Sequence, residues 1–126
     1  MSRFRGRGDP SRGSVSIESM ILVPVFLGVV LLTLQASMWI YASTVAQAAA
    51  QDGARAGTVA GAHRDDGSRM ATGVLTSRHV GTDWKVETFP DSDGLLVVIT
   101  GRSLSVIPGV SLGVRESATL PWEVPR

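Results

Sequence analysis

The feature that most constrains this chain is a long run without a charged side chain, from Ser19 to Gln51. Its most apolar part extends from Met20 to Ala42. A helix rises about 1.5 Å per residue and the hydrocarbon core of a bilayer is about 30 Å thick, so this part can span a membrane. The alternative is a buried core helix, but a chain of 126 residues could hardly surround one on every face. The sequence therefore predicts one membrane-spanning helix.

The charges before this run predict its orientation. Only Asp9 and Glu18 offset four arginines there, Arg3, Arg5, Arg7 and Arg12. Basic residues tend to stay on the cytoplasmic side, so we expect a cytoplasmic N-terminus and an extracytoplasmic remainder. The chain is then a single-pass protein of the cell membrane, which is the inner membrane in bacteria that have two membranes.

Three residues of the run fit a membrane helix. Trp39 and Tyr41 lie where interfacial aromatic anchors are expected. Pro24 would kink a soluble helix but is tolerated early in a membrane helix, and we expect a kink there.

The N-terminal segment allows three interpretations. A secretory signal peptide would be cut after Ala48, in the small-residue sequence Ala46-Gln47-Ala48, and would release an exported soluble binding domain. The length of the apolar run and the charge of Glu18 disfavour that interpretation. The second is an uncleaved, membrane-anchored accessory protein. The third interpretation gives Glu18 a purpose.

A basic leader ends at Arg12-Gly13, Glu18 follows at the fifth position after the glycine, and the apolar run comes next. This order resembles the type IV prepilin signal, which a membrane-embedded aspartate protease cuts after the glycine. The resemblance places the cut between Gly13 and Ser14. It also implies that Glu18 pairs with the N-terminal amine of a neighbouring subunit. Insertion of a carboxylate at mid-membrane costs about 2.5–3.5 kcal/mol on insertion scales. This cost favours an interpretation in which Glu18 has an oppositely charged partner.

A longer stretch of the sequence makes this resemblance specific to one family. Gly13, Glu18 and Pro24 fit the pattern R-G-x-x-x-x-E-x-x-x-x-x-P, and a second pattern, A-A-x-x-G-A-R-A-G, is filled from Ala49 to Gly57. Together they resemble the N-terminal half of the TadE-like minor pilins, or pseudopilins, of tight-adherence (Flp-type) pili. Ser19 departs from the family, which often has an apolar residue after the glutamate.

The resemblance implies partners and a place of action. The partners are a prepilin peptidase, other pilin subunits, and an inner-membrane assembly platform with its ATPase. The place is the membrane and, after assembly, a surface filament.

The remainder predicts an α+β fold. The long helix should continue to Gly57 or Gly61, and Asp65 or Asp66 could cap a second helix through about Ser77. Strands are expected at 84–88, 95–100 and 115–120, with a turn at 90–94 and further strand segments over 104–112, broken at Pro108-Gly109. The expected units are a leader over 1–13, a long helix over 14–61 and a small exported α+β domain over 62–126.

A stripe of small residues runs along the second part of the long helix. Small side chains at three- and four-residue spacing allow close helix packing, either between subunits of a filament or on the chain's own sheet. The sequence leaves both possibilities open for this stripe, which consists of Ala42, Ala46, Ala49, Gly53, Ala56 and Ala60.

The sequence offers no residues for an active site. There is no cysteine, and His63 and His79 stand apart from any metal-ligand pattern. The acidic segment 91–94 is better explained as a turn than as a calcium loop. The Arg-Gly leader sets topology more often than it binds nucleic acid. We therefore expect that the protein is not an enzyme and that it binds no metal, cofactor, small-molecule substrate or nucleic acid.

Overall fold

The structure is a computed structural model that describes residues 11–59, 61–63 and 65–124. It contains two helices, α1 (Ser11–Thr58) and α2 (Asp66–Arg78), followed by three strands, β1 (Gly81–Pro90), β2 (Gly94–Ser103) and β3 (Gly113–Pro121). The strands form one antiparallel sheet in the order β1-β2-β3. The predicted α+β class, with a long N-terminal helix and a small antiparallel sheet, is confirmed.

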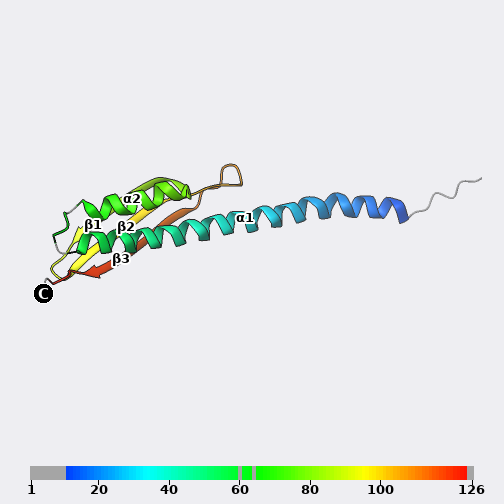
Figure 1. Ribbon diagram of the computed structural model, residues 1–126. Coiled ribbons are helices and arrows are strands. Elements are labelled where there is room, and N and C mark those ends of the chain that lie inside the picture. Colours follow the sequence, from blue (N-terminus) through cyan, green and yellow to red (C-terminus); the bar gives the residue numbers. More distant parts are fainter. Residues whose placement is uncertain (1–10, 60, 64, 125–126) are drawn as a thin grey trace, which may run out of the picture.

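The two halves of α1 have different surroundings (Figure 1). The C-terminal half lies across β2 and β3, and α2 lies beside it over β1. The N-terminal half extends beyond the sheet by itself. One continuous helix therefore belongs to a folded domain at one end and projects from it at the other.

The small-residue stripe forms the helical side of the core. Ala42, Ala46 and Ala49 are completely buried, and Gly53 is buried as well. The three alanines belong to one core with Val97 and Ile99 of the sheet's inner face, which are also fully buried, whereas Gly53 contacts α2. Ala56 is half-buried, and Ala60 lies outside the described residues. The stripe therefore packs within the chain's own domain, against both the sheet and α2. Small side chains let the helix approach the sheet closely enough to exclude water.

Glycines bring α1 and α2 into backbone contact. A Cβ atom on Gly53 would lie 2.8 Å from the carbonyl oxygen of Gly67 and 3.0 Å from the Cβ of Ala71. A Cβ on Gly67 would lie 2.7 Å from the carbonyl oxygen of Gly53. Because no side chain fits between the two helices there, the crossing depends on glycine from both sides.

The start of α2 differs in detail from the prediction. Asp65 occupies the N-cap position, but its side chain makes no capping hydrogen bond. Asp66 instead accepts a hydrogen bond from the backbone N–H of His63 through Oδ2, at 2.7 Å. The carboxylate thus orders the turn that precedes α2 and adds negative charge to the helix's first turn, where the macrodipole favours it.

The strand prediction was wrong for residues 104–112. Strands were found where expected around 84–88, 95–100 and 115–120, but 104–112 is a loop between β2 and β3. Pro108 lacks a backbone donor, and Gly109 has a φ of 80°, which strand residues do not adopt. The amide of Val110 instead donates to the carbonyl of Ile107 at 3.2 Å, closing a tight turn at the loop tip.

Candidate functional site

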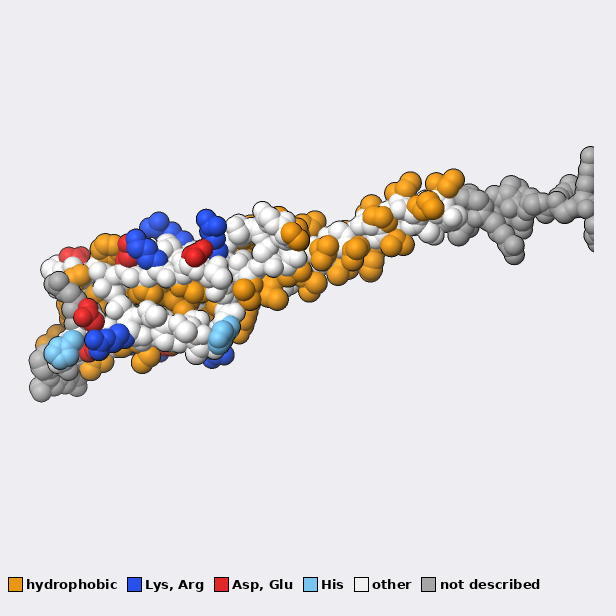
Figure 2. Space-filling model, turned by 90° about the horizontal axis from the view of Figure 1, so that it is seen from above, with side chains coloured by type: hydrophobic (Ala, Val, Ile, Leu, Met, Phe, Trp, Pro, Cys, Tyr) orange, Lys and Arg blue, Asp and Glu red, His pale blue; other side chains and the backbone are white. Residues whose placement is uncertain are grey.

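The free half of α1, from Ile17 to Leu34, is the most unusual surface of the molecule (Figure 2). At about 1.5 Å per residue it is about 27 Å long, close to the thickness of a bilayer's hydrocarbon core. α1 is long and apolar enough to cross a membrane, judged by length and composition. Twelve large apolar side chains are exposed along this half: Ile17, Met20, Ile21, Leu22, Val23, Val25, Phe26, Leu27, Val29, Val30, Leu32 and Leu34.

Such a surface needs apolar surroundings. Soluble proteins rarely expose contiguous apolar patches of this size, since each buried methylene group is worth about 0.8 kcal/mol. Apolar side chains face every direction around the helix axis, so a partner on one side could not cover them all. A lipid bilayer, or a ring of neighbouring helices, would.

The residues predicted to direct processing lie at the N-terminal end of the free half and just before it. Glu18 is exposed at this end, and the next charged residue along the helix is Asp52. Gly13 and Ser14 both lie within α1, so the peptide bond between them is helical. A protease that binds an extended substrate would first have to unwind this end of the helix, and Gly13 lowers the cost of doing so. Of the leader's charges, Arg3, Arg5, Arg7 and Asp9 lie outside the described residues.

Pro24 lies within the free half, and α1 continues through it. Its ring lacks an N–H, so the carbonyl of Met20 loses its usual intrahelical donor. Neighbouring helices or water can satisfy such a carbonyl, which is why proline is tolerated in membrane helices. The predicted kink at Pro24 stays a prediction.

Gln35 marks the other end of the free half and was not singled out by the sequence. Its side chain is buried, with 3% of its surface exposed, and it attaches the loop 104–112 to α1. Its Oε1 accepts hydrogen bonds from the amides of Val106 at 2.8 Å and Ile107 at 3.4 Å. Its Nε2 donates to the carbonyl of Leu104 at 3.3 Å. The available signal was a lone amide side chain inside an otherwise apolar run.

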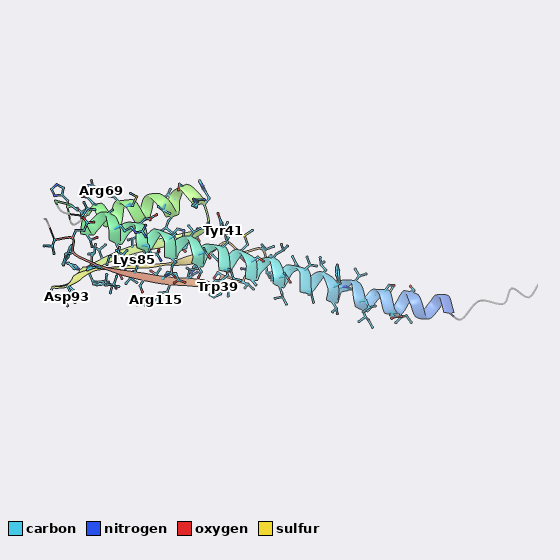
Figure 3. The ribbon with its side chains drawn as sticks, turned by 60° about the horizontal axis from the view of Figure 1, so that its bottom comes forward. Trp39, Tyr41, Arg69, Lys85, Asp93 and Arg115 are labelled. Atoms are coloured by element: carbon cyan, nitrogen blue, oxygen red, sulfur yellow. The ribbon has the colours of Figure 1, made fainter. Side chains whose placement is uncertain are left out.

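Trp39 and Tyr41 lie beyond Gln35, alongside the domain. Figure 3 places them on different sides of α1, Trp39 towards β3 and Tyr41 towards α2. The indole Nε1 of Trp39 donates to the carbonyl of Gly113 at 3.0 Å, which joins α1 to the start of β3. Their predicted role as interfacial anchors stays a prediction. Trp39 has in addition a structural contact that the sequence did not indicate.

The described residues show no arrangement that could carry out catalysis through a metal. Within them, no group of three or more histidine or acidic side chains is close enough to hold an ion. The segment 91–94 is a turn, as predicted: the Asp91 carboxylate accepts from the amide of Ser92 at 2.7 Å, and the Asp91 amide donates to Gly94. On the sheet surface, the hydrogen bond and charge of Glu87 raise the pKa of the exposed Lys85 ammonium, which stays protonated at neutral pH.

Comparison with known proteins supports the resemblance read from the sequence. Residues 13–55 match the family model described as TadE-like protein, which confirms that resemblance for this part of the chain. The matched segment runs from the predicted cleavage site through the free half of α1 into the part that packs on the sheet. Neither the curated proteins nor the solved structures gave a significant match. The TadE-like match points to a pilus-associated protein, and the apolar part of α1 is consistent with a single membrane span within the described residues.

Proposed function

We propose that this chain is a TadE-like minor pilin or pseudopilin that acts in the assembly of a Tad-type pilus. The free half of α1 inserts into the cell membrane with its N-terminus in the cytoplasm, and a prepilin peptidase removes the leader after Gly13. The domain formed with α2 and the sheet stays on the extracytoplasmic side. The observation that carries the proposal is the free half itself, a bilayer-length apolar helix with Glu18 at its N-terminal end.

The arrangement suits a subunit that must leave the membrane for a filament. Membrane helices associate through van der Waals packing and interhelical hydrogen bonds rather than through a hydrophobic driving force. The free half could therefore exchange lipid for the helices of neighbouring subunits at little cost. The domain would move with it unchanged, because its core is built on the other half of the same helix.

Glu18 supplies the polar interaction in this proposal. After cleavage the α-amino group of Ser14 becomes the new N-terminus and carries a positive charge close to the apolar region of the membrane. Pairing between Glu18 and the amine of a neighbouring subunit would be stronger in this low dielectric than at a protein surface. An unpaired carboxylate would oppose insertion of the free half into an apolar assembly.

The signal-peptide alternative fits the fold poorly. Cleavage after Ala48 would cut α1 inside the part that packs on the sheet. The released domain would lack Ala42, Val45 and Ala46, all of which belong to the core. The loss of such buried groups typically costs several kcal/mol. An uncleaved anchor is compatible with the same fold and is separated from the proposal only by experiment.

The test begins with the N-terminal residue of the chain purified from membranes and from sheared surface filaments. A start at Ser14 supports the proposal. A start at Ala49 means a signal peptide, and a start at or near Met1 means an uncleaved anchor.

The role of Glu18 is tested by Glu18→Gln, which keeps the shape of the side chain and removes its charge. We expect this variant to insert and to be cleaved but to fail in pilus assembly. Asp52→Asn removes a carboxylate from the folded half of the same helix and serves as the control, with assembly unchanged. Normal assembly by the Glu18 variant would disprove the amine-pairing mechanism.

A further inference from the structure

The loop 104–112, called here the apolar loop, lies at the end of the domain that faces the free half of α1. Figure 1 shows it extending from the sheet along α1, in the direction of the free half. Its attachment to Gln35 fixes it at the point where that half meets the domain.

The composition of the apolar loop is unsuited to water. No charged residue occurs between Arg102 and Arg115. Four of its large apolar side chains are between 36% and 41% exposed: Leu104, Val106, Val110 and Leu112. Loops on soluble surfaces are usually polar, and exposed apolar residues gathered in one place indicate an interaction surface.

The conformation of the apolar loop is well defined. Its two ends are joined by the amide of Ser103, which donates to the carbonyl of Leu112 at 3.0 Å. The amide of Leu104 donates to the carbonyl of Val80, and the turn at Pro108-Gly109 closes the tip. With Gln35 holding its first half, the loop presents its apolar side chains from a fixed backbone.

Distance along α1 places this loop at a membrane surface. A hydrocarbon core of about 30 Å that begins near Ile17 ends about 3 Å beyond Leu34, beside Gln35. Arg102 and Arg115 flank the loop at its base, and both are exposed. Long basic side chains at this depth reach lipid phosphates while their stems stay in apolar surroundings. The apolar side chains of the loop and the two arginines at its base therefore match the apolar and charged layers of a bilayer interface.

We propose that the apolar loop inserts into the outer interface of the bilayer, as a second membrane contact beside α1. The inference rests on the proposed insertion of the free half and adds to it an orientation of the domain. The occupant is lipid rather than a second copy of the chain, because the loop continues the apolar surface of the span at the depth where the span ends. Two contacts would hold the domain at one angle to the membrane plane until the helix is extracted.

The test uses single labelled cysteines in the full chain, which has none of its own. Val110→Cys reports on the apolar loop, Gly28→Cys on the middle of the free half, and Ser92→Cys on the distant β1–β2 turn. The site at Gly28 has open space around it, since an added Cβ would have no heavy atom within 4 Å apart from its chain neighbours and the nearby backbone of its own helix. Each variant carries an environment-sensitive fluorophore in phosphatidylcholine–phosphatidylglycerol vesicles with nitroxide lipids, placed either near the headgroup or deep in the acyl chains.

We expect headgroup-level nitroxide to quench the label at Val110 at least twofold, and deep nitroxide to quench the label at Gly28. The label at Ser92 should be unaffected by both. Quenching at Gly28 without quenching at Val110 would overturn the inference while leaving the membrane span in place. Absence of quenching at Gly28 would overturn both the inference and the proposed function.

Two further measurements separate lipid from protein contact. Quenching at Val110 should be the same at a tenfold lower protein-to-lipid ratio. Quenching that appears only on dilution would assign the loop to a second copy, which shields the label from lipid at the higher ratio. Val106→Asp with Leu112→Asp should abolish the quenching at Val110 and leave that at Gly28 unchanged. Unaltered quenching at Val110 in this charged variant, with a native near-ultraviolet circular dichroism spectrum, would refute lipid insertion.

Discussion

The contact between α1 and α2 at Gly53 makes a quantitative prediction. Gly53→Ala places a methyl group 2.8 Å from the carbonyl oxygen of Gly67 and 3.0 Å from the Cβ of Ala71. The first neighbour is backbone and cannot rotate away, so the two helices must separate by several tenths of an ångström. Overpacking of this kind typically costs about 1–3 kcal/mol. Alanine gains about 1 kcal/mol over glycine in a helix interior, so the net loss should be about 0–2 kcal/mol.

The control variant removes the uncertainty about helix propensity. Gly73→Ala makes the same change inside α2, where the added Cβ has no heavy atom within 4 Å apart from its chain neighbours and the nearby backbone of α2 itself. It should stabilise the domain by about 0.5–1 kcal/mol. Subtracting one variant from the other cancels the propensity gain and leaves the packing cost of about 1–3 kcal/mol.

Thermal unfolding of the full chain in detergent micelles measures this difference. Near-ultraviolet circular dichroism would follow the loss of tertiary structure in the wild type and both variants. In a domain of this size each kcal/mol shifts the Tm by about 4–8 °C, so Gly53→Ala should melt at least 4 °C below Gly73→Ala. Equal melting temperatures would show that the helices are not in backbone contact at Gly53.

Two more predictions test contacts of the domain. Gln35→Leu should leave the carbonyl and amides of the apolar loop without their partner, costing about 1–3 kcal/mol, and hydrogen exchange should show faster exchange at Val106. Unchanged protection at Val106 would contradict the attachment. Gly101→Val should push the indole of Trp84 from the sheet, because a Cβ at Gly101 would collide with that ring. Tryptophan fluorescence should shift to longer wavelength, whereas Gly113→Val, with open space at its Cβ, should leave the spectrum unaltered.

The sequence was sufficient to predict the elements set by local patterns. The uncharged run predicted one long helix, and alternation around Trp84 and the continuous apolar run from Leu95 predicted two neighbouring strands. These patterns depend on residues close in the chain, where helical and strand periodicity are visible.

What the sequence could not predict depended on contacts between distant residues. The pattern Leu104, Val106, Val110 and Leu112 suggested strands, but its backbone groups are bound by Gln35, Val80 and the loop itself. Local propensity cannot indicate that a glutamine about 70 residues earlier supplies these hydrogen bonds.

The candidate site divided in the same way. The sequence predicted roles for Gly13, Ser14 and Glu18 through a motif, and the matched segment includes these residues, whose roles stay predictions. The sequence did not indicate what the small-residue stripe packs against, since alanines at helical spacing allow close contact with any partner. In the folded chain, Ala42, Ala46 and Ala49 belong to the core of the chain's own domain.

The continuity of α1 has a mechanical consequence. The described structure has no linker between the free half and the half that carries the core, so a force along the helix axis would reach the domain without a hinge to absorb it. Rotation of the free half about the helix axis would likewise turn the domain by the same angle. If the chain enters a filament as proposed, the handedness and step of helix packing inside the shaft would therefore determine how the domains are displayed on its surface.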